Sequence, residues 1–528
     1  MTAVATAGSA GRSASRAGLA TAAVLVFLTA IGALLRLAVA GQSLFGDELS
    51  TYWIVSTHDL GGVVAVVHDE IEITPPLSFV LSWLTTRIDL TPELLRAPSL
   101  LAGVAAIPLV YLIGVRTVGR AAALVAAAIT ALAPFMIYYS AEARAYEPML
   151  VLVLLSTLAL MTALRDDRAR WWIAYGTCTC AAVYTHYTSV FGLAAQLAWV
   201  LVAFPEARRR ALLANAGAVV GFLPWLGGMF NDFSSPDSRI LTLLAPFTPH
   251  NVRLSVEHWS IGFPYVTPTT ELRDLPGVVA LLALALGLAS ALVALVGRSF
   301  IDTARPRLDR RLALVVAMAL AAPIGAALVS AVGSDLFVAR NLAVSWPWFA
   351  LLLAALLCGG GSRVRFAAVG LVIAGFAVGA AKTLDADVRR PDYGAAAAFV
   401  DRAASSRDVV LDHAALFVAP GPLTGLDAAL RRRHQIIRVG VSEQREHNFR
   451  PGDPVLPLEE VVRRATQPSR GRIFVVSSES GFAASTDFWD QQLAPRRRLE
   501  TRSFPGFIRL AVLVYADGAP IVRERASG

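Results

Sequence analysis

The sequence predicts an all-α polytopic membrane domain of about eleven transmembrane helices, followed by an extracytoplasmic α/β domain. Three observations lead to this fold class. The chain has 528 residues, of which 55% are hydrophobic and 16% charged, and its mean hydropathy is +0.57. Its arginines stand in short groups between long apolar runs, and its last quarter loses those runs. A soluble protein must cover itself with more polar surface than this chain has, and the three cysteines all lie inside apolar runs. Composition therefore excludes soluble globular, disulfide-scaffold and disordered classes.

The first apolar run is predicted to be a retained membrane helix. Residues 1–16 are small and polar and include Arg12 and Arg16. The following run, Gly18–Ala40, is longer than the apolar core of a signal peptide, and no small-residue cleavage site follows it. Its basic flank places the N-terminus in the cytoplasm and the chain from Gly41 onward outside.

Ten further apolar runs follow, and the arginines between them set the predicted topology. If the runs cross alternately, every basic group falls on the cytoplasmic side, including Arg208–Arg210 and those between 298 and 311. The segment Pro75–Ile88 has only fourteen residues, and counting it as a span would reverse these loops, so we expect an interfacial or re-entrant helix there. The ten runs are 97–115, 121–139, 148–164, 171–187, 188–204, 211–230, 277–297, 312–332, 342–361 and 366–381.

The odd number of spans places the C-terminal part outside. This part alternates one helical pattern, Tyr393–Ala404, with short strand-like runs, which is typical of a small α/β domain. The strand-like runs are Val409–Leu411, Gln435–Val439, Arg472–Ser477 and Leu510–Tyr515. The predicted organisation is a tail at 1–16, a membrane domain at 17–382 with outside loops at 41–75 and 231–276, and an extracytoplasmic domain at 383–528.

Unusual polar residues gather on the predicted outer surface. Asp47 and Glu48 stand a few residues beyond the first helix, among apolar and aromatic neighbours that would hold them at the bilayer interface. Burial there costs a charged group free energy unless the group has a partner or a function. A hydrated loop start is the simpler interpretation of this pair.

Other outer segments carry two arginines on the side where arginine is rare. Arg144 follows Tyr139 and Glu142 in the second outside loop, and Arg340 joins the ninth and tenth spans. An arginine that reaches the aqueous interface from a tyrosine belt would also explain Arg144. Because the spans cross alternately, these segments share the outer membrane face with Asp47, with Glu72, and with His186 and Tyr187 at the end of the fifth span. The convergence of these polar residues on one face favours a functional site.

At these residues the chain resembles the GT-C membrane glycosyltransferases, in the broad family of protein O-mannosyltransferases and lipid A aminoarabinose transferases, in a form common in actinobacteria. The resemblance implies a sugar donor carried on polyprenyl phosphate, transfer on the extracytoplasmic side, and an acceptor that each subfamily selects. The matching motifs are L-R-x(8)-F-G-D-E from Leu35 to Glu48, T-P-P-L at Thr74–Leu77, L-L-R-A-P-S at Leu94–Ser99, P-F-M-I-Y-Y-S-A-E-A-R-A-Y at Pro134–Tyr146, T-H-Y at Thr185–Tyr187, A-R-N-L at Ala339–Leu342 and R-P-D-Y at Arg390–Tyr393.

The resemblance also implies roles for individual residues. A phosphate leaving group is weakly basic, so its departure needs electrostatic stabilisation rather than a proton, and one catalytic carboxylate suffices. By resemblance Asp47 is the base in an inverting displacement, and Glu48 orients Asp47 or the acceptor. Arg144 and Arg340 would bind the donor phosphate, because guanidinium groups bind its oxygens bidentately, and Arg36 is a third candidate. The expected substrate-binding residues are Glu72, Tyr139, Glu142, His186 and Tyr187.

Several questions stay open at this stage. A divalent metal ion is one, since His68, Asp69, Glu70, Glu72 and His186 could supply ligands, although their spacing fits no specific metal motif. Mannose is the family-level expectation for the sugar, with arabinofuranose as the alternative, and a cell-envelope glycan, glycolipid or protein is the expected acceptor. A catalytically silent assembly or transport protein on the same scaffold is the alternative of another class. The lipid bilayer is the expected environment, and the scattered arginines favour no nucleic-acid partner.

Overall fold

The computed structural model separates the chain into two compact units, which are described one at a time. The first contains Met1–Val39, Leu60–Leu81 and Arg96–Lys382, and the second contains Ala40–Asp59, Ser82–Leu95 and Thr383–Gly528. The structure describes residues 2–69, 72–234, 245–262, 275–299, 309–359, 362–413, 423–439, 455–456, 458–467, 471–478, 486–517 and 523–524.

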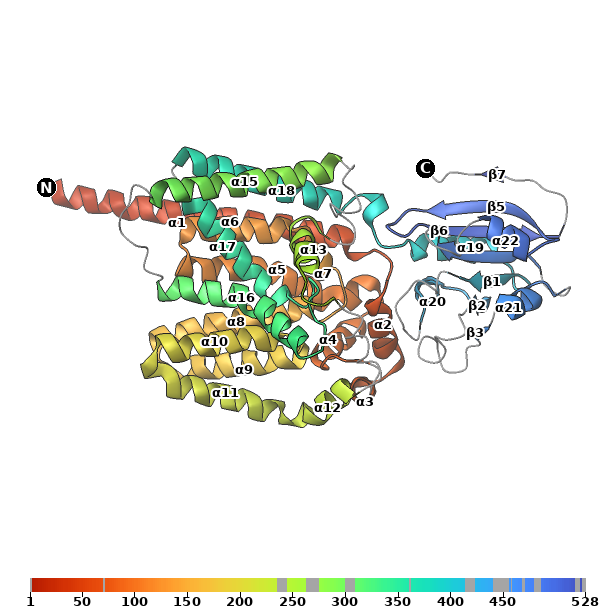
Figure 1. The fold of residues 1–528 in the computed structure, drawn as a ribbon, viewed down its shortest axis with the longest axis horizontal. Coiled ribbons are helices and arrows are strands. Elements are labelled where there is room, and N and C mark those ends of the chain that lie inside the picture. The colour runs from red at the N-terminus through yellow and green to blue at the C-terminus, as the bar shows by residue number, and fades with distance from the viewer. Residues whose placement is uncertain are drawn as a thin grey trace. The chain divides into compact units, whose positions relative to one another are not determined.

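The first unit is made of helices, and each of the eleven predicted apolar runs is helical over most of its described residues (Figure 1). Pro98 and Pro108 are accommodated within α5 and Pro323 within α16. The helices are α1 (Thr2–Ala40), α3 (Leu60–His68), α4 (Leu77–Thr86), α5 (Pro92–Thr117), α6 (Arg120–Leu132), α7 (Pro134–Ser140), α8 (Tyr146–Asp166), α9 (Ala169–Thr185), α10 (Ser189–Ala203), α11 (Arg208–Phe222), α12 (Leu226–Ser234), α13 (Pro249–Ile261), α15 (Leu275–Ser299), α16 (Arg310–Ala331), α17 (Trp346–Gly359) and α18 (Ser362–Lys382). Helices α4 and α5 also contribute residues to the second unit.

Helix length and composition confirm a multi-pass membrane protein. Within the described residues, six helical segments are long and apolar enough to cross a bilayer, and a seventh is added if α6 and α7, which meet at a 57° bend, form one broken span. The prediction of about eleven spans also counts shorter apolar helices such as α10 and α17. The helix expected at Pro75–Ile88 is α4, whose ten residues are too few to span the bilayer.

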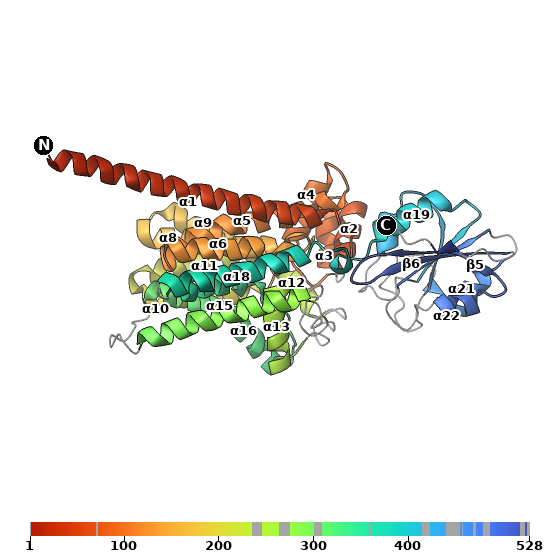
Figure 2. The ribbon, with the colours of Figure 1, turned by 90° about the horizontal axis from the view of Figure 1, so that it is seen from above.

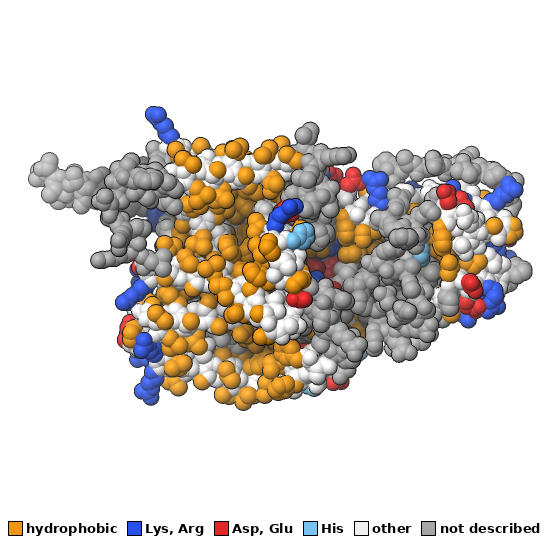
Figure 3. Space-filling view, viewed as in Figure 1, with side chains coloured by type: hydrophobic (Ala, Val, Ile, Leu, Met, Phe, Trp, Pro, Cys, Tyr) orange, Lys and Arg blue, Asp and Glu red, His pale blue; other side chains and the backbone are white. Residues whose placement is uncertain are grey.

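Hydrophobic side chains both fill the bundle and cover its surface. Helix pairs α15–α18, α8–α9 and α9–α11 pack side by side, and Figure 2 shows α15 and α18 running along each other. In Figure 3 hydrophobic side chains are spread over most of the visible face of the helices, and several lysine or arginine side chains stand at its left edge. Apolar side chains such as Ile173 and Leu328 are more than half exposed, which suits a lipid environment.

Arg36 joins three helices instead of reaching the aqueous interface. Its side chain is fully buried, and its guanidinium donates to the Ser140 hydroxyl at 2.9 Å and to the carbonyls of Thr130 and Ala131 at 3.1 and 3.2 Å. These contacts tie α1 to α6 and α7. A buried guanidinium needs such hydrogen bonds, because an unpaired charge in an apolar interior is costly. The structure thus explains Arg36 by helix packing.

The C-terminal part of the second unit is the α/β domain that the sequence predicts. Its seven-stranded sheet has the order β3-β2-β1-β4-β6-β5-β7, parallel from β3 to β4 and antiparallel between β4, β6 and β5. The elements are α19 (Tyr393–Ala403), β1 (Val409–Asp412), α20 (Gly425–Ala429), β2 (Gln435–Val439), β3 (Val455–Leu456), α21 (Leu458–Ala465), β4 (Ile473–Ser478), α22 (Thr486–Gln492), β5 (Arg497–Phe504), β6 (Leu510–Ala516) and β7 (Arg523–Glu524).

Side-chain alternation gives this sheet two covered faces. Val410, Phe474 and Val512 pack with α19, while Leu411 and Val475 pack with α21 and α22 on the other face, as Figure 2 shows for the helices. All four predicted strand-like runs form strands. Strand β5 was not predicted, because its sequence RRLETRSF is charged and mostly half-exposed rather than apolar.

The second unit also contains the helix that begins the first predicted outside loop. This is α2 (Asp47–Thr57), and it packs against α20. Arg87 donates to the Val55 carbonyl at 2.8 Å and Trp83 to the His58 carbonyl at 3.0 Å, so residues 82–95 hold the end of α2. Gly46, directly before α2, has φ +61°, a conformation that glycine adopts with little strain.

Candidate active site

The first part of the site is a buried ion pair in the helical unit. Arg144 donates through Nη1 and Nη2 to the two oxygens of Glu72, both at 3.0 Å, and the two side chains are 9% and 7% exposed. The Arg144 backbone carbonyl accepts from the Ser99 hydroxyl at 3.0 Å, and its guanidinium lies 5.7 Å from the centre of the Phe79 ring. This fork-to-fork pairing fixes the orientation of Arg144.

A second arginine and an aromatic cluster adjoin that pair. His186, directly after α9, is close enough to both Arg144 and Arg340 for their charges to act on its ring. Its Nδ1 contacts the Thr188 hydroxyl at 2.9 Å, and its ring centre lies 5.3 Å from that of Tyr146. Tyr139 lies equally close to Tyr146 and feels the charges of Glu142 and Arg340. The charge of Arg340 thus reaches both His186 and Tyr139, and that of Arg144 reaches His186.

Sequence reasoning missed an acidic residue next to this cluster. Asp232, on α12, is 2% exposed and accepts a short hydrogen bond from the Tyr187 hydroxyl, which also accepts from Trp225 Nε1 at 3.2 Å. The charges of Glu72 and His68 reach Asp232. Asp232 follows the apolar run 211–230 on the predicted outer face, and an acid at the end of such a run was the signal available in the sequence.

The predicted catalytic pair lies in the second unit. Asp47 is the first residue of α2 and is partly exposed, while Glu48 is fully buried. Both acids stand in the first helical turn, where the helix dipole favours negative charge. Glu48 forms an ion pair with Arg390 at 3.5 Å, and the two side chains are 0% and 1% exposed. Two adjacent acids thus have different environments.

The candidate metal ligands do not form a cluster in the part of the chain that the structure describes. Among those residues, no three histidine, cysteine or acidic side chains are arranged to hold a metal ion, and Glu70 lies outside them. His68 instead contacts the neighbouring Asp69 at 3.1 Å and the Trp225 ring at 5.6 Å. The described residues therefore do not fit a metal site, and no chemical step is assigned to one.

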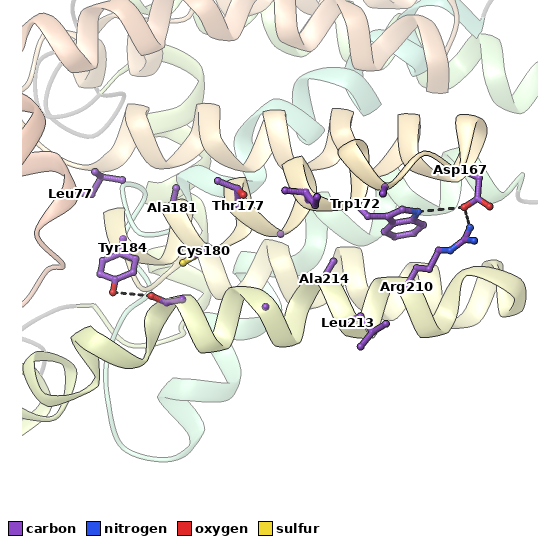
Figure 4. Close-up of a pocket in the computed structure, with 15 residues that line it drawn as sticks. Leu77, Asp167, Trp172, Thr177, Cys180, Ala181, Tyr184, Arg210, Leu213 and Ala214 are labelled. Carbon is purple, nitrogen blue, oxygen red and sulfur yellow. Dashed lines mark hydrogen bonds and ion pairs between the residues drawn. The ribbon is translucent and has the colours of Figure 1, made fainter.

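An apolar groove runs between α9 and α11. Its volume is about 860 Å³, and Figure 4 shows Tyr184 at one end, donating to the Gly221 carbonyl, and the Asp167–Arg210 ion pair at the other. The span from Asp167 to Tyr184 corresponds to roughly 25 Å of helix. Between these ends the groove is lined mainly by apolar and small side chains, among them Ala169, Ile173, Gly176, Ala181, Leu213, Ala214 and Gly217.

These features define a multi-pass helical membrane protein with a buried arginine–carboxylate cluster at one end of its bundle. A family model agrees with this description. Residues 74–227 match the family described as dolichyl-phosphate-mannose-protein mannosyltransferase. The resemblance predicted from the sequence is thereby confirmed for a stretch that includes Arg144, His186 and Tyr187 and leaves out Asp47 and Arg340.

Solved structures give more distant likenesses, and curated proteins give no sequence match. ArnT from Cupriavidus metallidurans in the apo state is 14% identical, with a TM-score of 0.44 over 95% of this chain and 98% of that one. The same protein bound to undecaprenyl phosphate is 13% identical, with a TM-score of 0.45 over 92% and 97%. Oligosaccharyltransferase AglB from Archaeoglobus fulgidus, with an inhibitory peptide and a dolichol-phosphate, is 13% identical, with a TM-score of 0.46 over 86% and 69%.

Proposed function

We propose that the protein is an inverting membrane glycosyltransferase that moves mannose from a polyprenyl-phosphate donor to a cell-envelope glycan, glycolipid or protein. Transfer takes place on the extracytoplasmic side, with the N-terminus of the chain in the cytoplasm and the C-terminal domain outside. The observation that carries this proposal is the buried Arg144–Glu72 pair with Arg340 and His186 beside it. Of these four residues, Arg144 and His186 lie inside the stretch that matches the mannosyltransferase family model.

Arg144 and Arg340 are proposed to stabilise the phosphate leaving group. When the bond between the anomeric carbon and the phosphate oxygen breaks, the electron pair leaves with the polyprenyl phosphate. Arg144 and Arg340 stabilise this negative charge, and their guanidinium groups stay cationic even where burial would neutralise a lysine. Glu72 holds Arg144 in place before the donor binds, so little reorganisation is needed during the reaction. Tyr139, Glu142, His186 and Tyr187 are proposed to contact the sugar or the acceptor.

Asp47 is the proposed base. The acceptor oxygen forms a bond to the anomeric carbon as the phosphate departs, and Asp47 takes the proton of the acceptor hydroxyl. This assignment rests on the family motif and on its partly exposed place at the start of α2. The displacement occurs once, so the configuration at the anomeric carbon inverts.

The groove between α9 and α11 suits the prenyl chain of this donor. Its outer end at Tyr184 and Gly221 is one helical turn before Tyr187 and Trp225, which belong to the polar cluster. A donor bound in this way would have its phosphate among the polar side chains of the cluster and its prenyl tail among the apolar side chains of the groove. The groove's length of roughly 25 Å exceeds one bilayer leaflet and favours a long prenyl chain over an acyl chain.

The test is sugar transfer by the purified full-length protein in nanodiscs. Labelled polyprenyl-phosphate mannose and polyprenyl-phosphate arabinofuranose are offered separately with envelope-derived acceptors. We expect mannose transfer by the wild type and a loss of about 10²–10⁴-fold in Asp47→Asn. Asp69→Asn, which changes an acid whose side chain is 72% exposed, serves as the matched control and should transfer normally.

Other outcomes would change the proposal in defined ways. Transfer of arabinofuranose alone would replace the sugar and keep the reaction. Equal transfer by wild type and Asp47→Asn would move the base to another residue. Binding of the donor without transfer of either sugar would favour a silent assembly protein on this scaffold.

A further inference from the structure

The buried ion pair of the second unit joins segments that are far apart in the sequence. Glu48 belongs to the first turn of α2, and Arg390 belongs to the R-P-D-Y motif that leads into α19. Their closest atoms are 3.5 Å apart, and almost none of either side chain is exposed. Removing two charges from water costs more than a single contact returns, so such a pair is a poor source of stability. Its best-attested use is to specify one arrangement of the chain.

Three further contacts join the C-terminal domain to the segment at the start of α2. The Arg390 backbone N–H donates to Gln42 Oε1 at 3.3 Å, and the Gly394 N–H donates to the Ser43 hydroxyl at 2.9 Å. The Phe45 ring meets the Phe507 ring edge-on at 5.3 Å. Every contact falls on residues 42–48, directly before or at the start of α2. The C-terminal domain therefore holds this start at several points, through its entry segment and through Phe507.

The segment around Arg390 is itself held by the loop before β6. The Phe507 N–H donates to the Arg389 carbonyl at 2.9 Å. A side chain at Gly506 would place its Cβ 3.0 Å from Pro391 Cα and 3.2 Å from the Arg390 carbonyl, so only glycine allows this close approach. A continuous series of contacts therefore links the loop before β6, the segment around Arg390 and the start of α2.

Asp47 is the residue next to Glu48. Successive helical residues point about 100° apart, which lets Glu48 face the domain interior while Asp47 stays partly exposed. A small shift of a catalytic group, on the order of 1 Å, can cost about 10²-fold in rate. Fixing Glu48 therefore fixes the place of Asp47.

We propose that Arg390 is a positioning residue: by binding Glu48 it sets the first turn of α2 and with it the catalytic carboxylate of Asp47. This inference rests on the proposed function. It assigns Glu48 to orientation of Asp47 rather than to proton transfer, and it gives the extracytoplasmic domain a direct part in catalysis.

The first experiment measures transfer kinetics of the full-length protein in nanodiscs with polyprenyl-phosphate mannose. The variants are Arg390→Gln, Arg390→Lys, Glu48→Gln and the double variant Glu48→Gln/Arg390→Gln. We expect Arg390→Gln to lower kcat by about 10–100-fold and to leave the donor KM unchanged, because Arg144 and Arg340 are intact. Arg390→Lys should recover part of kcat, and the double variant should be no slower than the slower single variant.

Arg472→Gln is the matched control in the same domain. The Arg472 side chain is 39% exposed and pairs at 2.9 Å with Asp408, which is 3% exposed, so its loss also breaks an ion pair to a buried acid. A fall in melting temperature with normal kcat is expected for this control. Equal losses of kcat in Arg472→Gln and Arg390→Gln, or additive effects of Glu48→Gln and Arg390→Gln, would overturn the proposal. Loss of transfer in Glu48→Gln with normal Arg390→Gln would also overturn it and make Glu48 itself catalytic.

Hydrogen exchange separates this inference from the proposed function. Backbone amides of residues 45–51 should exchange at least 10-fold faster in Arg390→Gln than in Arg472→Gln, whether or not the wild type transfers sugar. No transfer by the wild type together with faster exchange would reject the proposed function and keep the role of Arg390 in holding α2. Unchanged exchange at residues 45–51 would reject that role.

Discussion

The two units satisfy their buried arginines by different means. In the helical unit, Arg36 binds a hydroxyl and helix carbonyls, and Arg144 binds one carboxylate within a polar cluster that also includes Arg340 and His186. In the second unit, Arg390 and Arg438 each pair with a buried or nearly buried acid, Arg390 with the distant Glu48. Two arginines that converge on one cluster suit an anionic ligand, whereas matched pairs suit the fixing of chain segments. Under the proposed function, the comparison teaches that buried arginines serve donor binding in one unit and alignment of chain segments in the other.

The largest expected effect tests whether the arginines of the helical unit bind the donor. Arg144→Ala should raise the donor KM by at least 10-fold and destabilise the helical unit by about 3–5 kcal/mol, because it leaves Glu72 buried without its guanidinium. Donor titration and thermal unfolding in nanodiscs measure both effects. The control is Arg170→Ala, which removes an exposed arginine stacked on Trp171. Adding Glu72→Gln should restore stability and leave the KM high; recovery of both would show that Arg144 is structural.

The next prediction concerns the pH dependence of stability in the second unit, which contains the buried His413. Burial lowers the pKa of His413 to about 4, and the ring packs against Trp489. The unfolded residue has a pKa near 6.5 and takes up a proton first, so stability is present above about pH 6.5 and is lost as pH falls toward 4, by about 3 kcal/mol.

Hydrogen exchange of strands β1 and β4 at several pH values, corrected for intrinsic rates, measures this loss. In His413→Gln the dependence between pH 6.5 and 4 should become flatter. An unchanged pH dependence in that variant would assign the effect to another group.

A smaller effect tests alignment at the start of α2. Gly46→Ala should cost about 1–3 kcal/mol, because φ +61° strains any residue with a Cβ, and it should lower kcat more than it raises the donor KM. Gly119→Ala is the matched control: Gly119 also precedes a helix at positive φ, and in both glycines an added Cβ would meet nothing within 4 Å. Equal kcat in the two variants would argue that the start of α2 tolerates displacement.

The smallest effect concerns the lipid tail. Gly217→Leu fills the groove between α9 and α11 without a clash, since a Cβ at Gly217 meets nothing within 4 Å. We expect the KM for a long-chain donor to rise about 3–10-fold, with kcat and the KM for a short-chain analogue unchanged. Gly370→Leu, an equally open helical glycine outside the groove lining, is the control. Equal KM values for both variants would place the tail elsewhere.

Much of the fold could be predicted because its signals are local. Runs of apolar residues long enough for a bilayer form helices wherever they occur, and the apolar strands β1, β2, β4 and β6 follow from short β-branched runs. Arg144, His186 and Arg340 could be grouped as candidates because alternate crossings place them on one face. Strand β5 was not predicted because its charged sequence shows no apolar alternation. Asp232 was not predicted because a single acidic residue gives no periodic signal.

By itself the sequence determined the membrane class, the helical runs, the α/β character of the last domain and the residues that the family resemblance singles out. Only the tertiary structure decided which charges meet. It paired Arg144 with Glu72, used Arg36 to join helices, added Asp232 to the polar cluster and gave Glu48 a partner more than three hundred residues away. The physical reason is that hydropathy and periodicity act between neighbours in the chain, whereas a buried charge is satisfied by whichever group the packed fold brings within a few ångströms.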